Sequence, residues 1–132
     1  MYVKGITVRF IVFGFYVYDD LYATLTDDFN KYSVNNELDI KLDMVLFSEK
    51  NMTAERDDYE STIDVLLKKQ STDYDLYVYD PIFTRRYASH FVDLKELYGQ
   101  EYLDTFSYDG YQTSVYNNRW ISLVINIYLY NN

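Results

Sequence analysis

The spacing of apolar residues switches between strand and helix periods along the first part of the chain. Ile6 to Phe13 is an almost unbroken apolar run, which is typical of a fully buried parallel strand. The stretch Leu38 to Leu46 alternates apolar residues with Asp and Lys, which predicts a strand with one buried face. Tyr74 to Pro81, YDLYVYDP, predicts a third strand that ends at Asp80-Pro81, because proline donates no ladder hydrogen bond.

Two helices are predicted between these strands. The first begins at the capping acids Asp19 and Asp20 and ends at Asn35 and Asn36, and the second begins after Thr53. The order β-α-β-α-β favours parallel pairing, with the most apolar strand, the first, at the centre. Apolar stripes recur every three or four residues, as Leu21, Leu25, Phe29 and Tyr32 in the first helix and Tyr59, Ile63, Leu66 and Leu67 in the second.

The pattern changes after Pro81. Short helical pieces are expected over 82–90, 91–97 and 101–106. Two strands, 111–116 and 119–127, then flank Asn117-Asn118, since asparagine tolerates the positive φ of a tight hairpin turn. We therefore expect one α/β lobe over residues 1–132: three layers, a mainly parallel sheet and a C-terminal hairpin.

Composition narrows the possible partners. The chain has 132 residues, enough for one domain, and carries a net charge of −9, which disfavours binding to nucleic acid or to an anionic membrane surface. Aromatic residues make up 20% of the chain, including 17 Tyr. Tyrosine either fills the sheet or forms a surface that stacks on sugars or peptides. There is no cysteine, so neither a disulfide nor thiolate chemistry is available.

The N-terminal apolar run has a second interpretation. Ile6 to Tyr18 could be the core of a signal peptide after Lys4, but Arg9 interrupts it and no small-x-small cleavage pattern follows. The run is also too short to span a membrane, so a buried strand is favoured. Asn51-Met52-Thr53 is a glycosylation sequon, with Asn51 as the acceptor, and matters only if the chain is secreted.

The predicted carboxyl ends of the three strands are the candidate ligand site, because ligands of open α/β sheets bind there. These ends are Gly14 to Tyr18, Phe47-Ser48 and Tyr79-Asp80. Aromatic faces, a hydroxyl and a carboxylate suit a sugar-like solute. Asp80 has an alternative role as a turn or cap residue before Pro81.

Other chemistries have little support in the sequence. The first β-α turn has one Gly and no phosphate-binding motif, and the acids Asp19 and Asp20 beside it would repel phosphate. His90 is the only histidine, which is poor support for a metal site. No serine has a nucleophile-elbow context. We expect neither an enzyme nor a bound cofactor or metal.

Several segments resemble the N-terminal lobe of extracellular solute-binding proteins of the type II periplasmic-binding-protein-like family, in particular versions from anaerobic fungi. The segments are ITVRFIVFGF, LTDDFNKYS, LDIKLDMVLF, the run from Asp57 to Pro81, and HFVDLKEL, in which Phe91-Val92-Asp93-Leu94 matches the family's F-x-D-L segment. The resemblance implies a two-lobed clamshell that closes on a solute, often an oligosaccharide.

The resemblance also implies site residues and partners. Phe13, Tyr16, Tyr79 and Asp80 become cleft candidates, with Ser48 at the end of the second strand, and Trp120 matches the aromatic of the family's hairpin segment. A second lobe, and a membrane receptor or transporter region, are the implied partners. The expected location is extracellular or the cell surface, given an upstream signal.

Three functions therefore stay open. The chain ends at Asn131-Asn132, about where family members cross to the second lobe, so the expectation is half a clamshell and a weakly binding, truncated lobe. The alternative is a receptor-derived module that binds protein and no small molecule. A flavodoxin-like enzyme or signalling domain is disfavoured by the missing phosphate loop.

Overall fold

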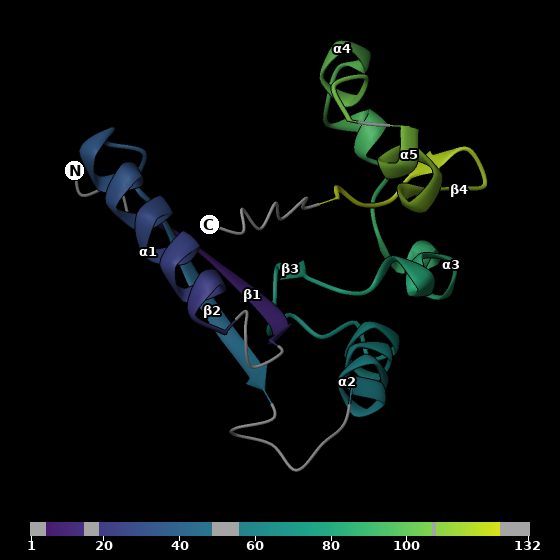
Figure 1. Ribbon diagram of the computed structural model, residues 1–132, viewed down its shortest axis with the longest axis horizontal. Helices are drawn as coiled ribbons and strands as arrows, with labels where there is room; N and C mark the ends of the chain where they lie inside the picture. The colour runs from purple at the N-terminus through teal and green to yellow at the C-terminus, as the bar shows by residue number, and fades with distance from the viewer. Residues whose placement is uncertain (1–4, 15–18, 49–55, 107, 125–132) are drawn as a thin grey trace, which may run out of the picture. The chain divides into compact units, whose positions relative to one another are not determined.

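The chain folds into two compact units, Met1–Tyr79 and Asp80–Asn132. The computed structural model describes residues 5–14, 19–48, 56–106 and 108–124 (Figure 1). That these units together form the one expected lobe stays a prediction. Each unit has buried apolar residues of its own, namely Ile11, Val12, Tyr59, Ile63 and Leu67 in the first and Tyr87, Ala88, Leu103, Trp120 and Ile121 in the second.

The first unit contains a three-stranded parallel sheet. Its elements are β1 (Ile6–Gly14), α1 (Asp19–Asn35), β2 (Ile40–Ser48), α2 (Arg56–Lys68) and β3 (Leu76–Tyr77). The strand order is β2-β1-β3, and both neighbours run parallel to β1. The mixed α/β class, the parallel pairing and the central first strand are confirmed.

The third strand is shorter than the predicted run. Only Leu76 and Tyr77 pair with β1, and Val78 still donates its backbone N–H to the Ile11 carbonyl at 3.0 Å. The Tyr59 hydroxyl lies 3.2 Å from the Ile11 carbonyl oxygen and 2.5 Å from that of Val78. This side chain from α2 therefore bridges the two strands where their ladder ends.

Helix α2 packs through the stripe that the sequence predicts. Tyr59, Ile63 and Leu67 are all buried, with Ile63 completely inaccessible. The spacing of four residues places these side chains on one face of the helix. The predicted packing of α2 is confirmed.

Helix α1 packs only partly through its predicted apolar stripe, of which Leu21 and Phe29 are half-buried. Leu25 is 49% and Tyr32 57% exposed, while Thr26 and Ser33 are the buried positions. Helix α1 lies along β2 (Figure 1), the edge strand of the sheet, and its polar side chains bond to the outer backbone of that strand. The expectation was wrong for Leu25 and Tyr32, because unpaired backbone groups at a sheet edge also need partners, and here polar side chains supply them.

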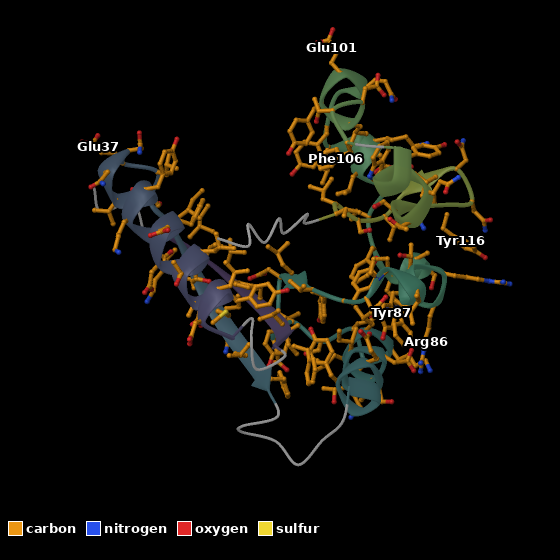
Figure 2. All side chains as sticks on the ribbon, viewed as in Figure 1. Glu37, Arg86, Tyr87, Glu101, Phe106 and Tyr116 are labelled. Carbon is orange, nitrogen blue, oxygen red and sulfur yellow. The ribbon has the colours of Figure 1, made fainter. Side chains whose placement is uncertain are left out.

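Both long helices end on a residue with left-handed backbone. Glu37 has φ of 54° and Gln70 has φ of 52°, and Glu37 is labelled at the end of α1 in Figure 2. In α1 the Leu38 N–H bonds to the Ser33 carbonyl, and in α2 the Ser71 N–H bonds to that of Leu66. These long backward bonds are those of a Schellman motif, which usually has glycine at the left-handed position.

The second unit is built from short elements around a hairpin. These are η1 (Pro81–Phe83), α3 (Thr84–Tyr87), η2 (Ala88–His90), η3 (Leu94–Glu96), α4 (Gln100–Leu103), α5 (Tyr108–Ser114), β4 (Val115–Tyr116) and β5 (Arg119–Trp120). The short helical pieces are confirmed. The hairpin turn is confirmed as well, with φ of 50° at Asn117 and 58° at Asn118.

The strands of the hairpin are shorter than expected. The stretch Tyr111–Ser114, predicted as strand, belongs to helix α5, where Gly110 and Ser114 lie four residues apart and are both buried. Tyr111, Thr113 and Val115 are residues that favour strands, but this preference depends on context and does not exclude a helix. Strand β5 ends at Trp120, and the end of the predicted strand, residues 125–127, lies outside the described residues.

Candidate functional site

The carboxyl ends of β1 and β2 lie side by side, as the ligand-site hypothesis requires. Phe13 pairs in register with Phe47, and Gly14 pairs with Ser48. The rings of Phe13 and Phe47 lie 5.4 and 5.8 Å from the ring of Tyr59. The two phenylalanines therefore form one aromatic cluster with Tyr59 at the carboxyl ends of these strands.

The other residues predicted near this edge are described less fully. Tyr79 is half-buried and follows β3 by two residues. Tyr16 and Asn51 lie outside the described residues, as does the side chain of Ser48. Ligand contact by any of these residues stays a prediction.

Asp80 acts as a helix cap. Its carboxylate accepts a hydrogen bond from the Ile82 N–H at 3.0 Å, and Pro81 occupies the first turn of η1. Proline suits this position because its missing N–H would have no partner there. The cap role considered for Asp80 is confirmed, and its role in binding stays a prediction.

Trp120 belongs to the second unit and is only 4% exposed. Its indole N–H donates to the Ser122 carbonyl at 2.9 Å, and its ring meets Phe106 and Tyr111 edge-on. One side of the ring lines a small pocket of about 180 Å³, together with Lys95, Gln100, Tyr111, Val115 and Asn118.

A second hollow, of about 560 Å³, follows the outer surface of α1 and is lined by Asp27, Asn30, Lys31, Val34 and Asn35. Phe13, Tyr79 and Asp80 line neither hollow. The pocket beside Trp120 combines two aromatic rings with an ammonium and two amides, a set that can hydrogen-bond and stack on a small polar molecule.

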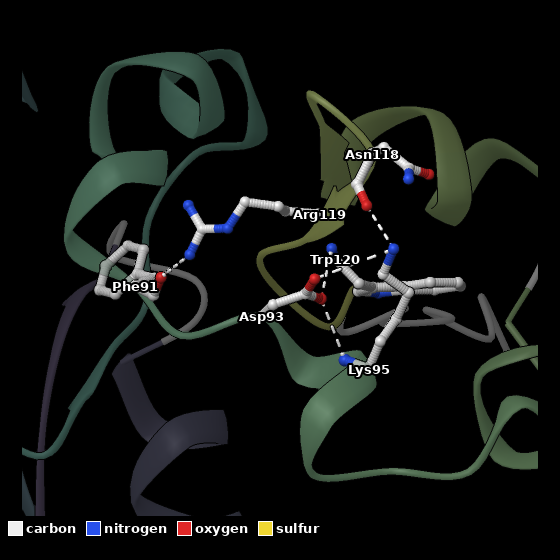
Figure 3. A network of polar contacts seen from close by, with 6 residues as sticks. All are labelled: Phe91, Asp93, Lys95, Asn118, Arg119 and Trp120. Carbon is white, nitrogen blue, oxygen red and sulfur yellow. Dashed lines mark hydrogen bonds and ion pairs between the residues drawn. The ribbon is translucent and has the colours of Figure 1, made fainter.

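A polar network that residue patterning missed holds the hairpin beside this pocket (Figure 3). The Asp93 carboxylate accepts hydrogen bonds from the N–H groups of Trp120 at 3.0 Å and Lys95 at 3.1 Å. The Lys95 ammonium lies 3.8 Å from this carboxylate and donates to the Asn118 carbonyl in the turn. Asp93 therefore caps η3 and anchors β5 with one side chain.

Arg119 makes the second attachment of the hairpin. Its guanidinium donates to the carbonyls of Ala88 at 2.9 Å and Phe91 at 2.5 Å. The sequence contains one signal for this network: Phe91-Val92-Asp93-Leu94 predicts the entry into a short helix, and it also matches the F-x-D-L segment of the family resemblance. Asp93 directly precedes the helical turn of η3, and an Asp at this position is an N-cap pattern that predicts one of its two bonds, the one from the Lys95 N–H.

The charges around Asp93 affect its titration. Burial acts to raise the pKa of the Asp93 carboxyl, but the Trp120 and Lys95 N–H groups, with the charges of Lys95 and Arg119, together hold its pKa below the ordinary value of 3.8. The carboxylate form is thus the form that the hairpin attachment requires.

Neither a metal-binding cluster nor a membrane-length apolar helix is present in the part of the chain that the structure describes. Within it, no group of three or more His, Cys, Asp or Glu side chains is placed to hold a metal ion. Among its helices, none has both the length and the apolar character needed to cross a bilayer.

Comparison with models of protein families, with curated proteins and with solved structures finds no match to this chain. The resemblance to type II solute-binding lobes therefore stays a prediction.

Proposed function

We propose that this chain is a non-catalytic binder of a small, polar, sugar-like solute at the carboxyl ends of its parallel strands. The observation that carries the proposal is the parallel register of β1 and β2, which pairs Phe13 with Phe47 and Gly14 with Ser48 at one edge of the sheet. In open parallel sheets this edge is where ligands bind. Aromatic rings there supply stacking surface for a sugar ring.

The pocket beside Trp120 supports the same class of ligand in the second unit. Its volume of about 180 Å³ lies below the roughly 300–1,000 Å³ of sites for drug-sized ligands, so it suits one ring and not a chain of sugars. Lys95 and Gln100 provide donors at its wall. The strand ends in the first unit and the Trp120 pocket in the second unit are separate candidate contacts for the solute.

The wider parts of the proposal follow from the family resemblance. They are a three-layer lobe, a second lobe that completes the clamshell, a receptor or transporter region as partner, and a location outside the cell. Single-lobe binding should be weak, because a one-walled site leaves much of the ligand in water.

A thermal-shift screen with neutral mono- and disaccharides tests the proposal. A binder at one hundred times its Kd stabilises the folded state by about 2.7 kcal/mol, which is visible as a rise in Tm. Asp80→Asn is the informative variant, since asparagine also caps a helix but carries no charge. We expect its ligand-free Tm to match that of the unchanged protein and its ligand-induced shift to shrink.

A second function, a protein-interaction module, is favoured by exposed apolar residues on the first unit. Ile6 is 62%, Val34 78% and Leu76 52% exposed. Exposed apolar residues that gather into one patch often contact another protein. If no solute in the screen raises Tm and light scattering shows a self-associated or partner-bound species, this function replaces solute binding.

A further inference from the structure

The outer edge of β2 is covered by side chains that take the place of a neighbouring strand. The Leu42 N–H donates to Asn30 Oδ1 at 2.8 Å, and Asn30 Nδ2 donates to the Leu42 carbonyl at 3.0 Å. This exchange of one donor and one acceptor is the pattern that two directly opposed residues make in an antiparallel sheet. The side-chain amide of Asn30 thus occupies both outward backbone groups of Leu42.

Ser33 repeats this arrangement two residues earlier on the strand. Its hydroxyl donates to the Ile40 carbonyl at 2.5 Å and accepts from the Ile40 N–H at 3.2 Å. The Thr26 hydroxyl makes a different contact, since it donates to the Tyr22 carbonyl of its own helix at 2.7 Å and lies 3.8 Å from the side-chain sulfur of Met44. Ile40 and Leu42 lie two residues apart and direct their backbone groups to the same side of β2, so Ser33 and Asn30 of α1 follow the strand edge in register.

These polar bonds hold α1 where apolar packing is incomplete. Leu25 and Tyr32 of the apolar stripe are about half exposed, whereas Ser33 is 2% exposed. Strand β2 has nine residues and is an edge strand, which is a template for pairing with another chain when its backbone is uncovered. A second copy of the chain offers the same edge, and two such edges pair by two-fold symmetry.

We infer that Asn30 and Ser33 are edge-guard residues, and that the surface they block is a self-association surface on which β2 of a second copy would pair. The guard binds no ligand and takes no part in the proposed solute site. Its test therefore stands whether or not sugars bind.

The test uses the full chain and the double variant Asn30→Ala, Ser33→Ala. Size-exclusion chromatography with light scattering should show a mass that rises to a dimer or beyond as concentration increases. Amide hydrogen exchange gives the location. We expect the Ile40 and Leu42 amides of the variant to exchange at least about tenfold more slowly at high than at low protein concentration, because pairing with a copy protects them.

Two controls separate the guard from general destabilisation. Asn35→Ala removes an exposed asparagine from the same helix and should behave like the unchanged protein. Leu67→Ala weakens the core from α2 and should lower Tm without making exchange at Ile40 and Leu42 depend on concentration. If circular dichroism shows that the double variant is unfolded, Ser33→Ala alone takes its place.

Three outcomes overturn the inference. One is a variant that stays monomeric at all concentrations with open Ile40 and Leu42 amides. Another is a dimer in which these amides exchange freely, which would place association on the exposed apolar residues instead. The third is a Leu67→Ala protein whose Ile40 and Leu42 amides show the same dependence on concentration.

Discussion

Asp93 is the residue whose ionisation matters most to the second unit, because one carboxylate holds both η3 and β5. Its pKa is lower in the folded state than the ordinary value of 3.8, since bound N–H groups and nearby cations favour the charged form. A lowered folded-state pKa contributes stability that is fully present above pH 3.8. This stability is lost as pH falls through the folded-state pKa.

We predict that Asp93→Asn removes the pH dependence of stability that comes from the Asp93 carboxyl. Asparagine keeps an acceptor for the Trp120 and Lys95 N–H groups but loses the charge. The variant should unfold at lower denaturant than the unchanged protein at pH 7, and the difference should narrow below pH 3.8. Trp120 fluorescence in urea at a series of pH values measures it, and a pH-independent difference would contradict the prediction.

Glu37 adopts a backbone conformation that suits glycine better than any residue with a side chain. Left-handed φ costs an L-residue roughly 1–2 kcal/mol, and the extra freedom of glycine in the unfolded chain returns about 0.4–1 kcal/mol of that. We therefore predict that Glu37→Gly stabilises the protein by about 0.5–1 kcal/mol. Urea unfolding followed by circular dichroism measures the change.

Substitutions at Gln70 and Asn36 provide the controls for Glu37→Gly. Gln70 closes α2 with the same geometry, so Gln70→Gly should have the same sign. Asn36→Gly, one residue earlier and outside the left-handed region, should destabilise the protein, because its side chain also donates to the Tyr32 carbonyl. A stabilising Asn36→Gly would show that chain freedom, and not φ, controls this turn.

At the scale of elements, the sequence correctly predicted the helices and strands that have a clear local pattern of apolar residues. The apolar run of β1, the alternation in β2 and the stripe from Tyr59 to Leu67 predicted these elements and their order correctly. The expected full burial of β1 was wrong, because only its second half reaches the core: Ile11 and Val12 are buried, whereas Ile6 is 62% exposed. Local patterning also predicted the Asn117-Asn118 turn, because few residues accept two consecutive positive φ values.

The errors arose where an element is held by contacts that its own period does not encode. The orientation of α1 depends on the free backbone of β2, which becomes an edge only once the strand order is set. The network around Asp93 joins residues 27 positions apart in sequence. For the candidate site, the sequence correctly predicted that Phe13 lies beside the end of β2. It did not predict that Trp120 would be buried.

At the scale of the whole molecule, the chain offers a natural reporter for each unit. Trp120 is the only tryptophan and lies in the second unit, with its ring contacts on Phe106 and Tyr111 of that same unit. The two long helices, α1 and α2, lie in the first unit and dominate the helical signal in circular dichroism. Fluorescence therefore follows the second unit, and circular dichroism mainly follows the first.

We predict that Ile63→Ala separates the two signals. Ile63 is completely buried in the first unit, and removing such a side chain typically costs about 2–5 kcal/mol. If each unit is stabilised by its own buried residues, the helical signal should be lost at lower urea while the midpoint of the Trp120 transition stays in place. Leu103→Ala, equally buried in the second unit, should move the fluorescence transition instead. Coincident shifts of both signals in both variants would contradict independent units, and would favour the single cooperative lobe that the sequence predicts.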